Sequence, residues 1–273
     1  MQQQIVYIHY KILASKCLAL SEKKLPTCKF IDIISKMEDV KLILAVETSG
    51  RQGSVAIADG AKLLEERRFQ APMTHSAELF PAIENLLEKF DRKQAEIKEV
   101  YISIGPGSFT GLRIAVTFAK MMNLSIGAKI VAVNTLDVIA ENATAYAKET
   151  TEIQRIATIL DAKRSKFFIA FYELKEGKWV KILSDSLMSA EEFLEKNHDF
   201  NTKNKVFLLG EGLVYYKDNF AGEGIEFLNA KSWVPGAGNV YKLGYQKALR
   251  GDYADAVTLT PFYMRGADAK IKG

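Results

Sequence analysis

The sequence has few of the residues that carry redox and metal chemistry. Its only two cysteines, Cys17 and Cys28, lie in the first 36 of 273 residues, and it has three histidines, His9, His75 and His198. A disulfide scaffold and a cysteine-ligated metal site are therefore excluded for the rest of the chain. Because no two histidines are close in sequence, a His-x-x-x-His metal site cannot be built either.

Long apolar runs and a surplus of one charge are also lacking. No run approaches the ~18 residues that a membrane-spanning helix needs, and candidates such as Leu42 to Val46 have the length of a strand. Of the 37 basic and 33 acidic residues, six lysines, Glu22 and Asp32 lie in residues 1–36, so the remaining 31 basic and 31 acidic residues balance. A nucleic-acid-binding surface over the whole body is not supported. We expect a soluble cytoplasmic protein that does not associate with membranes.

Residues 1–36 are expected to be an extension that precedes the globular part. His9, Lys11 and Ser15 interrupt the apolar stretch that a secretory signal needs, and the segment has no arginine, unlike a mitochondrial presequence. A strongly strand-like run begins a few residues after Met37. We interpret Met37 as the natural start of the protein. The alternative is that residues 1–36 form an added regulatory or docking segment.

From Lys41 onward, the apolar patterns predict two units with the same order of elements, βββαβα. In the first unit, strands are expected at 42–48, 54–58, 63–69 and 100–104, with helices at 75–90 and 112–124. In the second, strands are expected at 156–160, 167–174, 179–184 and 206–209, with a helix that opens at Ser189 and has Glu192 as its capping-box partner. We expect a duplicated α/β fold with halves at 37–145 and 146–273, whose last helix, 239–250, packs back on the first half.

Residues 105–113, GPGSFTGLR, form a glycine-rich loop between a predicted strand and a predicted helix. The loop lacks the glycine spacing of the dinucleotide-binding fingerprint, the Gly-Lys-Ser/Thr of the P-loop, and the glycines of a nucleophile elbow. Two interpretations remain open: a tight connection that needs close backbone approach, or a site for an anion or nucleotide at a helix N-terminus. The candidate contacts are Thr48, Ser49, Gly105, Gly107, Ser108, Thr110, Gly111 and Arg113.

The string GPGSFTGLR after a strand closely resembles the signature of the TsaB (YeaZ) family. This family is the dimerisation subunit of the bacterial complex that installs threonylcarbamoyl on N6 of the tRNA adenosine next to the anticodon, a modification called t6A. Four other stretches resemble the family in order and spacing: 44–49 (LAVETS), 75–81 (HSAELFP), 161–164 (DAKR) and 261–265 (PFYMR). The resemblance covers essentially Lys41 to Arg265.

The resemblance implies the duplicated actin, hexokinase and Hsp70-like (ASKHA) fold and a subunit that is not itself an enzyme, although the family is sometimes labelled glycoprotease-like. Such a subunit has no catalytic or metal-binding residues, pairs with the catalytic subunit TsaD, works with the ATPase TsaE, and reaches tRNA indirectly through the complex. Threonylcarbamoyl-adenylate comes from a separate synthase. The resemblance does not decide whether the chain alone is a homodimer or a monomer.

Acidic residues at two strand ends bear on nucleotide chemistry. Kinases of this fold use an aspartate with an adjacent glycine in each half, whereas Glu47 stands at the first position here and Asp161-Ala162-Lys163 at the second. A longer side chain and an added Cβ both alter close phosphate approach. We therefore expect no cofactor of the chain's own and no ATP hydrolysis, with ATP or ADP shared at the partner boundary as the alternative.

The helix at 112–124 has almost no polar face, so it must be buried on more than one side. A core helix explains this as well as an interface does, and the resemblance favours an interface in which this helix and the helix at 75–90 form a four-helix contact with TsaD or a second copy. The expected interface residues are His75, Leu79, Ile83, Leu112, Val116, Ala119 and Met122. We expect Ala119→Glu or Val116→Arg to abolish pairing and leave the fold intact.

Two other classes of function remain open from the sequence. One is a stand-alone enzyme of the ASKHA fold, either a small-molecule kinase or a glycoprotease-like metal-dependent transferase. The other is a plain nucleotide-binding module. Both predict activity or binding by the isolated chain, whereas the subunit interpretation predicts activity only with partners.

Overall fold

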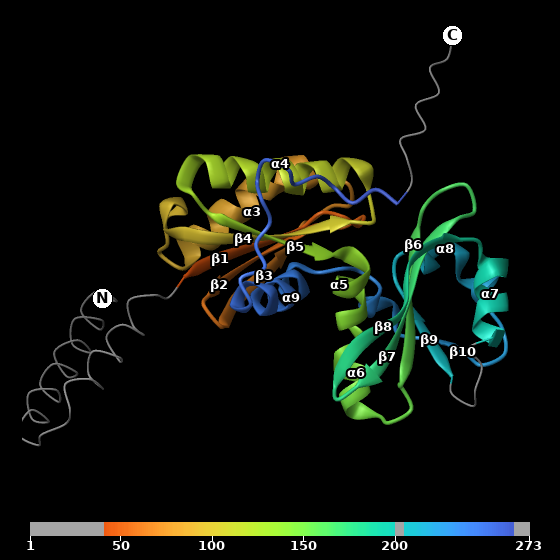
Figure 1. Cartoon of the computed structure of the whole chain (residues 1–273). Helices are drawn as coiled ribbons and strands as arrows, with labels where there is room; N and C mark the ends of the chain where they lie inside the picture. The colour runs from red at the N-terminus through yellow and green to blue at the C-terminus, as the bar shows by residue number, and fades with distance from the viewer. Residues whose placement is uncertain (1–40, 200–204, 265–273) are drawn as a thin grey trace, which may run out of the picture. The chain divides into compact units, whose positions relative to one another are not determined.

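Two five-stranded mixed sheets and their helices make up the computed structural model, which describes residues 41–199 and 205–264 (Figure 1). The expected start at Met37, both cysteines and Arg265 lie outside the described residues. No helix within the described ranges is both long and apolar enough to cross a membrane.

The first sheet has the strand order β3-β2-β1-β4-β5. Its strands are β1 (Leu42–Glu47), β2 (Ser54–Asp59), β3 (Lys62–Arg68), β4 (Ile97–Gly105) and β5 (Lys129–Asn134). β1 pairs antiparallel with β2 and parallel with β4, so the carboxyl ends of β1 and β4 lie at one edge of the sheet. The dipeptide Asp59-Gly60, a strong hairpin signal in a sequence, forms the turn that joins β2 to β3, with Gly60 at a positive φ of 53°.

Both faces of this sheet are covered by helices, as the continuous apolar run of β1 predicts. Leu42, Leu44 and Val46 point into a core shared with α3 (His75–Lys89) and α4 (Phe109–Ile126). Ile43 and Ala45 point the other way, into a core shared with α9 (Ala237–Leu249), so α9 packs on the first sheet from the end of the chain. In Figure 1 α3 and α4 lie above the sheet and α9 below it.

The second sheet repeats the order, as β10-β9-β6-β7-β8. Its strands are β6 (Arg155–Asp161), β7 (Phe167–Lys175), β8 (Lys178–Met188), β9 (Val206–Leu209) and β10 (Ile225–Phe227). Again the first strand pairs antiparallel with the second and parallel with the fourth. This repetition confirms the predicted duplication.

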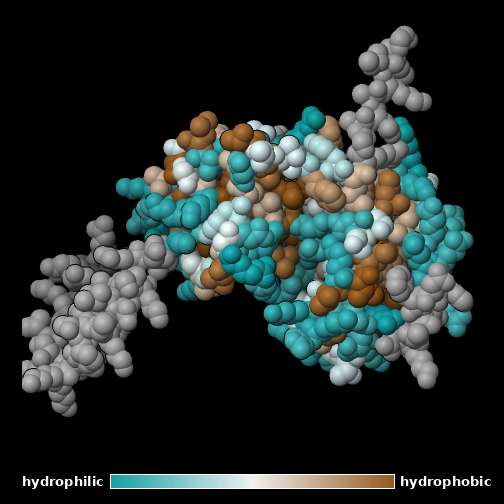
Figure 2. All heavy atoms as spheres, in the orientation of Figure 1, coloured by the Kyte–Doolittle hydropathy of each residue, from teal (hydrophilic) through white to brown (hydrophobic). Residues whose placement is uncertain are grey.

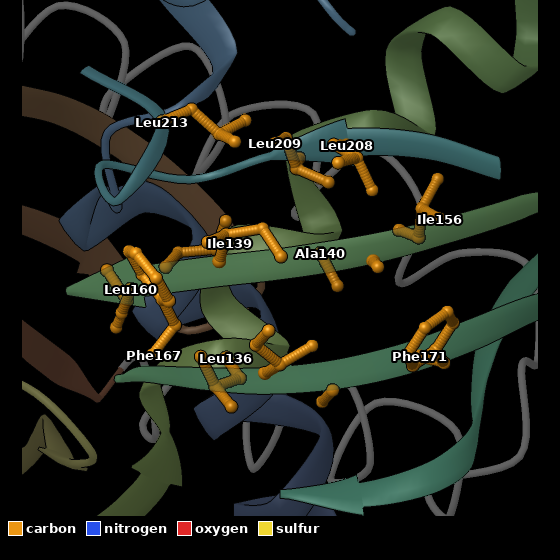
Figure 3. Close-up of a cluster of buried hydrophobic side chains, with 14 of the residues drawn as sticks. Leu136, Ile139, Ala140, Ile156, Leu160, Phe167, Phe171, Leu208, Leu209 and Leu213 are labelled. Carbon is orange, nitrogen blue, oxygen red and sulfur yellow. The ribbon is translucent and has the colours of Figure 1, made fainter. Parts of the chain in front are cut away.

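The core of the second half includes side chains from β6, β7, β9 and the helices α5 (Thr135–Glu141) and α8 (Leu213–Tyr216) (Figure 3), together with the fully buried rings of Phe193 and Phe220. α7 (Ala190–Asp199) opens with the predicted capping box: the Ser189 N–H donates to Glu192 Oε2 at 2.5 Å, and the Glu192 N–H donates to Ser189 Oγ at 3.2 Å. His198 belongs to the last turn of α7.

Four elements have no counterpart among the expected ones: β5, α5, α6 (Ala143–Glu149) and β10. Each half therefore has a fifth strand beyond the predicted βββαβα order. The expected boundary between residues 145 and 146 falls inside α6, because α5 and α6 form the connection between the sheets and β6 begins only at Arg155. Three short 3-10 turns complete the described chain, at Gln94–Glu96, Lys217–Phe220 and Ala230–Ser232.

Candidate functional site

The glycine loop connects β4 to α4 and rests on the end of β1. Thr48 Oγ1 donates a hydrogen bond to the Gly111 carbonyl at 2.7 Å, and the Ser108 N–H donates to the Ser49 carbonyl at 2.8 Å. Ser108 also caps α4, because its Oγ accepts a bond from the Gly111 N–H at 3.3 Å. Thr48, Ser49, Ser108 and Gly111 are thus brought together, and their polar groups bind one another.

Close backbone approach accounts for two of the loop glycines. A Cβ on Gly111 would lie 1.8 Å from the Thr48 carbonyl oxygen, and one on Gly107 would lie 2.6 Å from that of Ser49. No side chain fits at these distances. This is the tight connection that the sequence analysis gives as one interpretation, and contact of the loop with an anion or a nucleotide stays a prediction.

Glu47, at the end of β1, is completely buried. Its carboxylate accepts hydrogen bonds from the Ser49 N–H at 2.6 Å, from Ser49 Oγ and from Ser103 Oγ. Burial raises the pKa of this carboxyl above its usual range, although the hydrogen bonds from both serines oppose the rise. The carboxylate is committed to neighbours inside the chain.

A cavity of about 430 Å³ lies beside the ends of β1, β4 and β6. Side chains from both halves line it, including Arg51, Phe109, Leu160, Asp161, Glu211 and Tyr263. The stretches of the sequence that carry the family resemblance, apart from 75–81, contribute to its walls. A concave, largely apolar site with a few polar groups at strand ends is typical of ligand binding.

Contacts of Arg51 join the two halves beside this cavity. Glu211 Oε2 accepts a hydrogen bond from the Arg51 N–H at 2.7 Å, and the Arg51 guanidinium lies 5.0 Å from the centre of the Tyr215 ring. Burial raises the pKa of the Glu211 carboxyl, and the nearby Glu47 raises it further, against the hydrogen bond from Arg51. Arg51, Glu211 and Tyr215 carried no signal in the sequence.

The closing segment, residues 261–264, packs against the glycine loop. The Phe262 N–H donates to the Ile104 carbonyl at 2.7 Å, and a Cβ on Gly105 would lie 2.4 Å from the Phe262 carbonyl oxygen. Tyr263 Oη accepts a hydrogen bond from Arg113 Nε at 3.1 Å. Two motifs that are 150 residues apart in sequence therefore form one structure.

The helices α3 and α4 pack side by side, but the expected interface residues face inward. His75, Leu79, Ile83, Leu112, Val116, Ala119 and Met122 are each at most 5% exposed. A partner that docks on the intact fold would therefore touch their exposed neighbours. The expectation that Ala119→Glu and Val116→Arg leave the fold intact must also be corrected, because both substitutions would place a charge in the core of this chain.

Other apolar side chains on α3 and α4 are exposed. Phe80 is 48% exposed, Met121 40% and Leu124 89%, and Phe109 is also exposed. Thr110, expected in an anion site, lies instead at the α3–α4 groove, which has a volume of about 430 Å³ and is also lined by Phe80, Phe109, Arg113, Phe118 and Met121. Of the side chains that line this groove, Arg113 is the only charged one.

His75 is a structural residue in this arrangement. Its Nε2 lies 2.9 Å from the Gly50 carbonyl oxygen, to which it donates, and its Nδ1 is buried without a partner. Burial lowers the pKa of His75, which keeps the ring neutral. Among residues 41–199 and 205–264, no group of three or more His, Cys, Asp or Glu side chains could hold a metal ion.

The second half also has a glycine loop, in which Gly210 and Gly212 follow β9 and approach Ile159 of β6. Two halves with one strand order, each with a glycine loop packed against its first strand, define a duplicated α/β protein of the ASKHA class. A family model described as "TsaD: tRNA N6-adenosine threonylcarbamoyltransferase" matches residues 70–258, more than half of the chain. The chain belongs to this family, as a member of the TsaB (YeaZ) type.

The relatives agree with this assignment. The Bacillus subtilis "tRNA threonylcarbamoyladenosine biosynthesis protein TsaB" is 27% identical over 233 residues, which cover 84% of this chain and 96% of that protein. The Escherichia coli protein of the same name is 23% identical over 225 residues, 82% of this chain and 94% of that protein. The solved structure "YeaZ from Pseudomonas aeruginosa" superposes with a TM-score of 0.70 at 22% identity, over 82% of this chain and all of that one, and shows the fold alone.

Proposed function

We propose that this protein is a non-catalytic subunit in t6A biosynthesis. It pairs through α3 and α4 with a catalytic subunit of TsaD type, acts together with a TsaE-type ATPase, and thereby enables threonylcarbamoyl transfer to the tRNA adenosine next to the anticodon. The names of the TsaB relatives support the biosynthetic role. The tRNA is contacted chiefly by the assembled complex.

The exposed apolar face of α3 and α4 is the observation that carries this proposal. Figure 2 shows hydrophobic residues gathered at the top of the view, where α3 and α4 lie in Figure 1. Phe80, Phe109 and Met121 line the α3–α4 groove and are exposed, and Leu124, three residues after Met121 on α4, is exposed as well. Monomeric proteins rarely expose contiguous apolar surface of this kind, which usually marks an interaction site. A groove next to large apolar side chains suits the central anchors of a protein interface.

The buried Glu47 supports a non-catalytic role. ASKHA kinases hold magnesium and phosphate at this strand end, but here the carboxylate is tied to Ser49 and Ser103, and the Ser108 N–H is used by the Ser49 carbonyl. These residues do not fit a magnesium nucleotide bound by this chain alone. The proposal therefore includes no cofactor of its own, and ATP or ADP held jointly with the partner is the alternative.

Charge substitutions on the exposed face test the pairing. Met121→Glu and Phe80→Glu place a carboxylate where the partner's apolar surface would dock, at side chains that are 40% and 48% exposed, and thermal unfolding measures the stability that each change costs. We expect both variants to fold and to lose co-purification with the catalytic subunit. Leu249→Glu is the matched control, since Leu249 is 70% exposed at the end of α9. Unchanged co-purification of Met121→Glu and Phe80→Glu would refute the assigned face.

Reconstitution separates the proposed subunit from a stand-alone enzyme. tRNA threonylcarbamoylation is measured with the catalytic subunit, the ATPase and the synthase, with and without this protein. We expect modification only when it is present. Full modification in its absence would overturn the proposal, and ATP turnover by the isolated chain would support the kinase-like alternative.

A further inference from the structure

The α3–α4 groove is largely apolar, and Ser76, Thr110, Thr117 and Arg113 are the polar side chains that line it. Phe80, Ile114, Phe118 and Met121 supply its apolar lining, and Arg113 is its only charged side chain. In the described part of the chain Arg113 forms no ion pair. An exposed cation without an ion-pair partner, in the lining of a largely apolar groove, is complementary to an apolar side chain with a carboxylate close to it.

Arg113 is held in place by two aromatic rings. Its guanidinium carbon lies 3.8 Å from the centre of the Phe109 ring, and its Nε donates to Tyr263 Oη at 3.1 Å. The Phe109 and Tyr263 rings are themselves 5.2 Å apart. A long side chain that is fixed before binding loses less conformational freedom when it pairs. With Nε occupied, the two terminal nitrogens remain available for a carboxylate.

Tyr263 reaches this position from the far end of the chain. The Phe262 N–H bond to the Ile104 carbonyl anchors the segment beside the glycine loop. Tyr263 lies outside the lining of the groove and belongs to that of the cavity beside β1, β4 and β6, while Phe109 lines both. The closing segment therefore contacts the groove through Arg113 and Phe109, which its Tyr263 touches.

We propose that Tyr263 is a positioning residue for partner docking: it orients Arg113 to bind a carboxylate of the catalytic subunit whose neighbouring apolar side chain fills the α3–α4 groove. The inference rests on the proposed function, because the occupant is the TsaD-type partner. A second copy of this chain could offer Phe80 and Glu84, which are one helical turn apart on α3 and both exposed. The experiment therefore measures binding to the catalytic subunit itself.

The test is a double-mutant cycle by calorimetry with the purified catalytic subunit. Tyr263→Phe removes only the hydroxyl, and Arg113→Gln removes the charge from an exposed position. We expect an affinity loss of roughly 3- to 10-fold for Tyr263→Phe and roughly 10- to 100-fold for Arg113→Gln. The double variant should bind no more weakly than Arg113→Gln alone, because Tyr263 acts through Arg113.

Salt dependence is the second measurement. Added salt should weaken the wild-type complex and affect the Arg113→Gln complex much less, because the screened ion pair is gone. Tyr241→Phe is the control: Tyr241 Oη donates to the Gly60 carbonyl at 2.8 Å on the α9 face, so its loss should lower stability and leave affinity unchanged. Thermal unfolding of every variant separates a folding defect from a binding defect.

Each outcome distinguishes the inference from the proposed function. If the wild-type chain does not bind the catalytic subunit, the proposed function fails. If it binds and Tyr263→Phe binds equally well, or the two losses add, the positioning role fails and the docking face stands. Loss of self-association alone, with unchanged binding to the catalytic subunit, would also overturn the inference.

Discussion

The two halves of the molecule share the design of their glycine loops and differ in the helix that each loop leads into. In the first half the Ser108 N–H bonds to the Ser49 carbonyl, and in the second the Gly212 N–H bonds to the Ile159 carbonyl at 2.9 Å. After these loops, α4 has 18 residues and α8 only four. The bond between the loop and the first strand is common to both halves, and it brings a strand end and a loop together. The long helix with an exposed apolar side belongs to the first half alone.

The acidic residues at equivalent strand ends also differ. Glu47 at the end of β1 is buried and bound to serines. Asp161 at the end of β6 is partly exposed and forms an ion pair with Lys163 at 2.5 Å. The strand-end acid is thus part of the core in the first half, whereas in the second half it lies at the rim of the cavity.

The largest expected effect concerns the two glycine loops. We predict that Gly111→Ala costs about 4 kcal/mol or more of unfolding free energy, or prevents folding, because the new Cβ would overlap the Thr48 carbonyl. Gly212→Ala should cost about 1 to 3 kcal/mol, since its nearest neighbour is the Ile159 side chain at 2.9 Å. Gly127→Ala, which meets nothing within 4 Å but has a φ of 71°, is the control for backbone strain. Urea unfolding measures all three, and equal costs would contradict the ranking.

The second prediction separates the two sides of α4. Ala119→Glu should cost about 3 kcal/mol or more, because Ala119 is fully buried and the carboxylate would have no partner. Met121→Glu, two residues further on, should cost far less, because the Met121 side chain is 40% exposed. Chemical unfolding of both variants checks this. Comparable costs would mean that α4 has no distinct exposed side. The first half would then not differ from the second by a helix with an exposed apolar side.

The third prediction uses pH to compare the two strand ends. Burial raises the pKa of Glu47 in the folded state, so above pH 4.5 the folded state binds more protons than the unfolded state. The free energy of unfolding therefore falls as pH rises through the folded pKa of Glu47. Each unit of that rise costs about 1.4 kcal/mol when the group is charged. Glu47→Gln should therefore become more stable relative to wild type as pH increases from 5 to about 8.

Asp161→Asn is the matched variant for the second half. Its exposed ion pair with Lys163 should contribute about 1 kcal/mol or less. Urea unfolding across the same pH range compares the two variants. A Glu47→Gln difference that does not grow with pH would show that Glu47 is not a buried acid in solution.

The smallest expected effect concerns the helices that come after the third strand of each half. Ser189→Ala removes one half of the capping box of α7 and should cost about 1 kcal/mol. Ser189→Thr should restore most of it. The Thr74 side chain at the equivalent start of α3 caps no N–H and bonds to the Ala71 carbonyl instead. Thermal unfolding compares Ser189→Ala with Ser189→Thr. An unchanged stability of Ser189→Ala would mean that the capping box is not formed.

Much of the fold could be predicted because its signals are local. The buried runs of β1 and β6, the Asp59-Gly60 turn and the Ser189–Glu192 capping box each lie within a few residues. β5 has no counterpart among the expected strands because its apolar run, 130–133, begins only a few residues after α4 ends at Ile126. So short an apolar run cannot be distinguished from a helix end by periodicity.

The site could be predicted only in part. The glycine loop and the closing segment were identifiable as motifs, but the bond between Arg113 and Tyr263 spans 150 residues and has no local signal. The two helices expected at the interface do pack against each other, but the residues expected to contact a partner are buried, and the interface itself stays a prediction. α4 is apolar on nearly every side, so its periodicity does not reveal which side the sheet covers, and Phe80 lies outside the apolar stripe of α3.

The position of α9 has a consequence for the order in which the protein forms. Its residues Ala237, Val240 and Tyr241 cover one face of the first sheet, although they are synthesised long after β1. On the ribosome, a chain that has emerged only through residue 236 still leaves Ile43 and Ala45 facing water. The first half to be translated is therefore the last to be completed, and a stop codon between the halves would release a sheet that is covered on one side only.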